Sequence, residues 1–181
     1  MSKISRLTSK IKYVLMNENQ RSDAVIEKLR EGGAVIGNNV DILNSTIDMG
    51  EPYLIEIGDN VTITNATLLT HDASTKKALG YTKVGRVSIG SDVFVGLGAI
   101  ILPDTRIGSK VIVGAGTVVA KDIPDNSVVG GNPCKVICTY DDYIEKNKKT
   151  LESGLCFDKY PSEFNDDEKM QLKVSGKGFM R

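Results

Sequence analysis

The residue with the clearest capacity for chemistry is His71, the only histidine of the chain, in the stretch LLTHDAST at residues 68–75. A neutral imidazole accepts a proton near physiological pH, so it can serve as a general base. A lone histidine is more often packed or solvated than catalytic, so its role depends on its surroundings. Its neighbour Asp72 is not expected to orient it, because adjacent residues of a strand point to opposite faces.

The three cysteines, Cys134, Cys138 and Cys156, show no spacing typical of metal ligands. A structural zinc site needs four ligands, usually cysteine and histidine, and this chain has a single histidine. We therefore expect no metal site. An odd number of cysteines without a disulfide framework favours reduced thiols, which predicts a cytoplasmic protein.

The charges of the chain balance, with 23 basic and 23 acidic residues. No net charge therefore attracts the protein to nucleic acid or to an anionic membrane surface. No apolar run approaches the length needed to span a bilayer. The sequence thus predicts neither a nucleic-acid partner nor a membrane span.

A period of six residues runs through the middle of the chain. From residue 89 a branched aliphatic residue opens each of six successive hexads, and glycine follows it in four of them. These aliphatic residues are Ile89, Val95, Ile101, Ile107, Val113 and Val119. Helical spacing of three and four, or strand alternation by two, does not produce this pattern. A strict six instead predicts a solenoid of short strands joined by sharp corners.

The period breaks in two places, and loops at such breaks are where repeat proteins carry variable chemistry. One break lies between Ile42 and Ile57 and contains the stretch MGEPYLIE. The other lies between Leu69 and Ile89, where a polar, basic stretch predicts a loop near residues 75–87. His71 stands in the last regular hexad before this loop. We expect contacts to a bound ligand from this loop and from the break at residues 49–56.

The repeat [Ile/Val/Leu]-Gly-x-x-[small]-x, over residues 34–137, resembles that of the hexapeptide-repeat acyltransferases. The stretches EPYLIEIGDNVTI and LLTHD resemble most closely the bacterial sugar O-acetyltransferases, including galactoside, maltose and capsular polysaccharide enzymes. The resemblance implies an all-β solenoid, the left-handed parallel β-helix. It also implies acetyl-CoA as co-substrate, a saccharide acceptor, His71 as the general base, and a homotrimer with sites between subunits.

The same resemblance assigns the coenzyme site by matching motifs. Residues that match the acetyl-pantetheine and phosphate ends of that site are Phe94, Leu97, Ala115, Ala120, Lys121 and Lys135. Lysine ammonium groups bind phosphate as mobile point charges. One position departs from the galactoside-type pattern, because Cys138 stands where a second basic residue is expected.

Outside the repeat, the sequence predicts helices at both ends. An N-terminal helical segment is expected over residues 1–33, with helices in ISRLTSKIKYVLM and in SDAVIEKLRE, the second capped by Ser22. A C-terminal helix and tail are expected over residues 138–181. The acidic start and lysine-rich end of YDDYIEKNKKTL match the helix dipole.

Other functions fit parts of this pattern. The same base and coenzyme groove would serve an N-acetyltransferase of a nucleotide-linked amino sugar or an antibiotic O-acetyltransferase. A non-enzymatic β-helix scaffold is the alternative outside acyl transfer. A β-helix carbonic anhydrase is excluded, since its zinc needs three histidines.

Overall fold

The computed structural model describes residues 16–181 of the chain. The chain forms two compact units, one ending at Tyr140 and the other comprising Asp141–Arg181. The hexads all lie in the first unit. The helix expected over ISRLTSKIKYVLM lies outside the described residues except for Met16.

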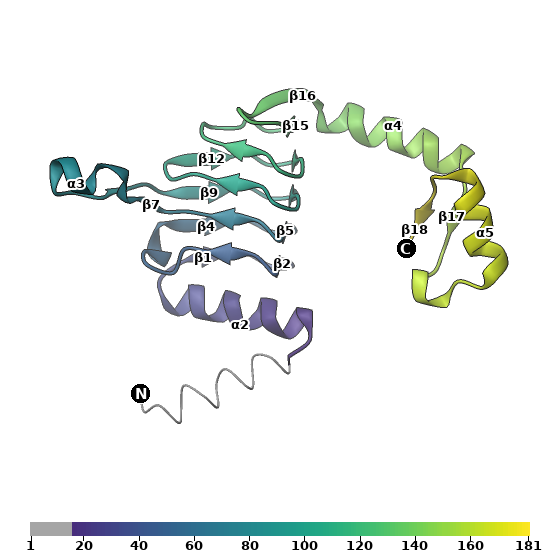
Figure 1. The fold of residues 1–181 in the computed structure, drawn as a ribbon, viewed down its shortest axis with the longest axis horizontal. Coiled ribbons are helices and arrows are strands. Elements are labelled where there is room, and N and C mark those ends of the chain that lie inside the picture. Colours follow the sequence, from purple (N-terminus) through teal and green to yellow (C-terminus); the bar gives the residue numbers. More distant parts are fainter. Residues whose placement is uncertain (1–15) are drawn as a thin grey trace. The chain divides into compact units, whose positions relative to one another are not determined.

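Short parallel strands of the first unit form three sheets, and successive strands along the chain enter successive sheets. Sheet one contains β1 (Val35–Ile36), β4 (Ile55–Ile57), β9 (Val87–Ile89) and β12 (Thr105–Ile107). Sheet two contains β2 (Val40–Leu43), β5 (Val61–Thr64), β10 (Val93–Val95), β13 (Val111–Val113), β15 (Ser127–Gly130) and the antiparallel β16 (Lys135–Thr139). Sheet three contains β3 (Thr46–Ile47), β6 (Thr67–Leu68), β11 (Ile100–Ile101) and β14 (Val118–Val119). The chain therefore passes through the three sheets in turn, coil upon coil (Figure 1).

The hexad pattern dictates which side chains fill the interior. All six aliphatic residues that open the hexads between residues 89 and 119 are at most 3% exposed. The strand register aligns them with their counterparts in neighbouring coils; Ile57, Ile89 and Ile107 are successive partners in sheet one. Because side chains alternate along a strand, the middle residue of each three-residue strand points outward. The repeat thus confirms the predicted parallel β architecture.

The helix α2 (Glu18–Glu31) precedes the first coil and buries Ile26 and Leu29. The predicted N-cap, Ser22, was wrong. Asn17 caps the helix instead, in a reciprocal capping box with Gln20. Ser22 lies within the helix, where its buried Oγ accepts a hydrogen bond from the backbone N–H of Ile42 at 2.8 Å. The capping box outcompetes Ser22 because it satisfies two otherwise unpaired N–H groups.

Both breaks of the period contain extra structure at the corner between sheets three and one. A short 3-10 helix, η1 (Pro52–Leu54), occupies the first break. At the second, an arm projects from the stack (Figure 1). It comprises β7 (His71–Asp72), η2 (Ala73–Thr75), α3 (Lys76–Leu79) and β8 (Lys83–Val84). β7 and β8 pair antiparallel, so the excursion expected from the sequence is a hairpin with a short helix at its tip.

The second unit contains most of α4 (Tyr140–Ser153), followed by a small α/β substructure. This substructure comprises β17 (Cys156–Phe157), η3 (Pro161–Glu163), α5 (Asp166–Ser175) and β18 (Phe179–Met180). The rings of Phe157 and Phe164 pack with centroids 4.6 Å apart. Within residues 16–181, no helix combines the length and the apolar character needed to cross a membrane.

Candidate active site

His71 is the first residue of the arm, at the point where the chain leaves sheet three. Its imidazole Nδ1 lies 2.5 Å from Oδ2 of Asp48, and its side chain is 43% exposed. The two atoms are close enough for an ion pair, and a carboxylate that faces Nδ1 favours the ring hydrogen on that nitrogen. In the neutral ring, Nε2 is then the nitrogen that can accept a proton.

Asp48 is held firmly at the end of β3. Its Oδ1 accepts a hydrogen bond from the backbone N–H of Gly50 at 3.0 Å, and its Oδ2 accepts from the Thr70 hydroxyl at 2.9 Å and the Thr70 N–H at 3.2 Å. Burial by itself raises the pKa of the Asp48 carboxyl. The hydrogen bonds from Gly50 and Thr70, together with the charge of His71, outweigh burial and hold this pKa below its ordinary value. Asp48 is therefore ionised near neutral pH and can stabilise an imidazolium.

A second carboxylate completes the cluster. Oε2 of Glu51 lies 3.4 Å from His71 Nδ1 and 3.3 Å from the Thr70 hydroxyl. The ligand-type atoms of Asp48, Glu51 and His71 all lie within 4.8 Å of one another, so they could also hold a cation. Asp48 and Glu51 both face Nδ1, so the cluster is a half-exposed histidine flanked by two carboxylates.

Asp72 takes no part in this cluster. Its Oδ2 pairs with the Lys83 ammonium at 2.7 Å, and its Oδ1 accepts from the Ser74 N–H at 2.8 Å. The hydrogen bond from Lys83, followed by those from Ser74, holds the pKa of Asp72 far below its usual range. Asp72 thus clamps the two strands of the arm, and its separation from His71 follows the expected strand alternation.

The residues matched to the acetyl-pantetheine arm lie on sheet two and at its corner with sheet three. Leu97 and Ala115 are both exposed in consecutive turns of that corner. The Gly116 N–H donates to the Leu97 carbonyl at 2.9 Å, which stacks the two turns. Phe94 points outward from the middle of β10 and is 45% exposed. Within one chain, these residues are therefore on a different corner from His71.

The residues matched to the phosphate end are exposed near the C-terminal coils. Ala120 and Lys121 follow β14, and Lys135 opens β16. Burial raises the pKa of the Cys134 thiol, and the positive charge of Lys121 partly offsets this. The Lys121 ammonium therefore lies near Cys134, the residue that precedes Lys135.

Sequence reasoning did not identify Asp48 or Glu51. The available signal was the break between Ile42 and Ile57, which contains both residues and is out of phase with the hexads. Only the stacking of the coils shows that this break and the one containing His71 share a corner.

The stacked hexads and the histidine–carboxylate cluster are the two features to compare with known proteins. Residues 86–121 match the family described as Bacterial transferase hexapeptide (six repeats). The chain is 42% identical over 163 residues to Protein CapG of Staphylococcus aureus, covering 86% of this chain and 88% of CapG.

Two solved structures extend the comparison. A maltose O-acetyltransferase from Clostridium difficile 630 is 32% identical with a TM-score of 0.51, over 69% of this chain and 78% of that one. A galactoside acetyltransferase in complex with coenzyme A is 28% identical with a TM-score of 0.50, over 74% of this chain and 61% of that one. The chain belongs to the hexapeptide-repeat acyltransferase family, close to the sugar O-acetyltransferases.

Proposed function

We propose that this protein is an acetyl-CoA-dependent O-acetyltransferase that acts on a saccharide hydroxyl, with His71 as its general base. The observation that carries the proposal is the half-exposed His71 imidazole, held through Nδ1 by the ionised Asp48. The similarity to CapG, to a maltose O-acetyltransferase and to a coenzyme A-bound galactoside acetyltransferase supports the reaction class.

His71 performs the proton transfers of this reaction. Nε2 removes the proton of the acceptor hydroxyl as its oxygen attacks the thioester carbonyl. Asp48 stabilises the imidazolium that forms. Backbone N–H groups stabilise the oxyanion of the tetrahedral intermediate. Collapse of this intermediate breaks the carbon–sulfur bond, and the imidazolium returns its proton to the departing thiolate.

The coenzyme lies along the C-terminal coils, as the family resemblance implies. Leu97 and Ala115 present their backbone to the acetyl-pantetheine arm, and Phe94 flanks the thioester. Ala120, Lys121 and Lys135 meet the phosphate end, where the lysines supply positive charge. The coil is left-handed as in the family, and the enzyme acts in the cytoplasm.

The active site forms between subunits of a homotrimer. His71 and the residues matched to the acetyl-pantetheine arm lie at different corners of one chain. A neighbouring copy in a closed symmetric ring can bring its own coenzyme face to this His71. Each subunit then supplies the base to one site and the coenzyme surface to another.

The proposal is tested by measuring thiol release from acetyl-CoA with sugars, amino sugars, sugar nucleotides and hydroxylated antibiotics. We expect release that depends on a saccharide hydroxyl and that falls about 10²–10⁴-fold in His71→Ala, the range for loss of a general base. Amino-sugar dependence would indicate N-acetylation instead. Equal turnover in both proteins would refute the role of His71, and failure to bind immobilised coenzyme A would favour a scaffold.

A further inference from the structure

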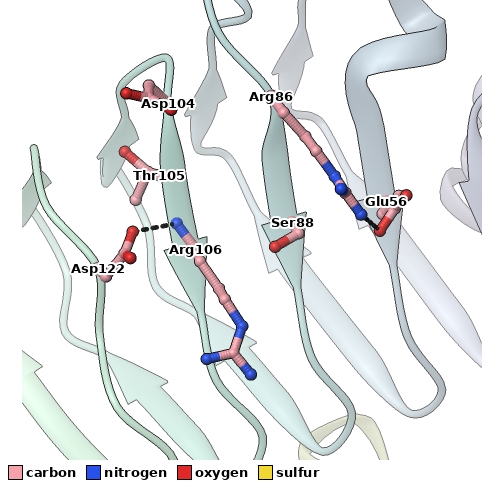
Figure 2. Close-up of a pocket in the computed structure, with 7 residues that line it drawn as sticks. All are labelled: Glu56, Arg86, Ser88, Asp104, Thr105, Arg106 and Asp122. Carbon is pink, nitrogen blue, oxygen red and sulfur yellow. Dashed lines mark hydrogen bonds and ion pairs between the residues drawn. The ribbon is translucent and has the colours of Figure 1, made fainter.

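A polar pocket of about 430 Å³ lies on the outer face of sheet one, outside the residues assigned to base and coenzyme. Figure 2 shows its side chains, which come from four successive coils. Its lining includes Glu56, Arg86, Ser88, Asp104, Arg106 and Asp122. Its volume is within the range of small-molecule sites. We call it the sheet-one pocket.

The pocket begins beside the arm that carries His71. His71 pairs with Val84, and Arg86 follows Val84 by two residues, or about 7 Å of extended chain. The Gly85 N–H between them donates to the Thr70 carbonyl at 2.8 Å. A Cβ built on Gly85 would lie 2.4 Å from the backbone N of Asp104, so the base of the arm packs directly against a residue of the pocket.

The strand register makes the pocket a ladder of donors and acceptors. Glu56, Ser88 and Arg106 are successive partners in sheet one, and Asp122 follows at the next coil, where Ile123 bridges to Ile107. Neighbouring strands are about 4.8 Å apart, so this column extends over about 14 Å. That length fits a short oligosaccharide and exceeds a single sugar ring.

The charges of the pocket favour a neutral, hydroxyl-rich ligand. Its three carboxylates outnumber its two guanidiniums, which disfavours a phosphate or another anion. Arg86 is paired with Glu56, and the Asp122 carboxylate accepts the backbone N–H of Arg106 at 2.8 Å. The guanidinium of Arg106 and the carboxylate of Asp104 make no hydrogen bond or ion pair with another side chain described here. Sugar hydroxyls can accept from the first and donate to the second.

We propose that the sheet-one pocket is an acceptor subsite that binds the saccharide units next to the one that is acetylated. The proposal rests on the proposed function for the identity of the reaction, whereas the pocket itself rests on its own geometry. It predicts an enzyme that prefers an oligosaccharide to a free monosaccharide.

The test compares wild type with Arg106→Ala and Asp104→Asn; the second keeps a residue type that tolerates the positive φ of 61° at this position. Lys148→Ala on exposed α4 is the matched control. Saturation-transfer NMR measures binding of di-, tri- and tetrasaccharides of hexoses, N-acetylhexosamines and deoxyhexoses, beside their monosaccharides, without acetyl-CoA. We expect wild type to bind the longer glycans more tightly than the monosaccharides. In both pocket variants the affinity for the longer glycans should fall about tenfold, as for loss of one hydrogen bond to a charged group.

Equal affinity for long and short glycans, no binding of any glycan by wild type, or no effect of the pocket variants would overturn the subsite. The outcome is independent of the thiol-release assay. Length-dependent binding that needs Arg106, without any acetyl transfer, would retain the subsite and refute the proposed function. Acetyl transfer to monosaccharides, with no dependence of binding on glycan length, would support the proposed function and refute the subsite.

Discussion

The contact between His71 and Asp48 is the smallest feature on which the proposed chemistry depends. Replacing Asp48 with Asn keeps the shape of the side chain but removes the charge that stabilises the imidazolium. We expect kcat to fall by less than the roughly 10²–10⁴-fold loss for removal of the base itself, with the KM for acetyl-CoA unchanged. Asp72→Asn is the matched control, because Asp72 pairs with Lys83 and not with His71. An equal loss of kcat in both variants would show that kcat depends on negative charge anywhere near the arm, and not on the pairing of Asp48 with His71.

The lowered pKa of Asp48 also predicts how stability responds to acid. The unfolded chain binds a proton at Asp48 at a higher pH than the folded chain, so the stabilisation is complete above about pH 4 and is lost below it. We expect Asp48→Asn to lower Tm at pH 7 and the difference from wild type to shrink by pH 3. Thermal unfolding followed by circular dichroism across this range measures it. A difference in Tm independent of pH would contradict an ionic role.

The sequence pointed to His71 as a candidate base, which stays a prediction, but not to the carboxylates beside it. His71 was predicted because a family motif and a break in the repeat coincide there. Asp48 and Glu51 belong to another coil. Their approach to His71 depends on how the corners of successive coils stack and on the hydrogen bonds from Thr70 to Asp48. Such geometry leaves no local pattern in one sequence.

At the level of elements, the hexads predicted the strands well because each strand repeats the same burial requirement. The residues at which helices begin and end were harder to predict. Ser22 and Asn17 are both good N-caps, and Gln20 decides between them through the reciprocal hydrogen bond of the capping box. The arm was predicted as a loop since its strands are only two residues long and pair with each other outside the repeat.

The base of the arm provides a test at this scale. In Gly85→Ala the added methyl group would lie 2.4 Å from the backbone N of Asp104, so the arm or the next coil must move. We expect a loss of about 1–3 kcal/mol in the free energy of unfolding. For a chain of this size Tm then falls by about 2–12 °C. Activity falls too, because the Gly85 N–H is hydrogen-bonded to the Thr70 carbonyl, and Thr70 positions Asp48.

The control is Lys77→Ala on α3, which should leave Tm unchanged. An unchanged Tm in Gly85→Ala would show that the arm is not anchored at Gly85.

For the whole molecule, the decisive question is whether one chain or two build each active site. His71→Ala removes the base, and Ala115→Trp fills the exposed turn assigned to the acetyl-pantetheine arm. Each variant alone should be inactive. If sites form between subunits, mixed trimers contain some interfaces where an intact His71 meets an intact coenzyme face of the other variant. In a random equal mixture this is one interface in four, so we expect about a quarter of wild-type activity.

The activity of such a mixture separates the two arrangements because their predictions differ in kind. Sites built within one chain carry one defect in every subunit, so co-refolded or co-expressed variants would stay inactive at any ratio. Sites between chains regain activity with a maximum at equal proportions, since the fraction of intact interfaces is the product of the two subunit fractions. Measuring thiol release across mixing ratios therefore tests whether His71 lies opposite a neighbour's coenzyme. A mixture of wild type with either variant must fall linearly with the variant's share, which checks that neither variant inactivates its intact neighbours.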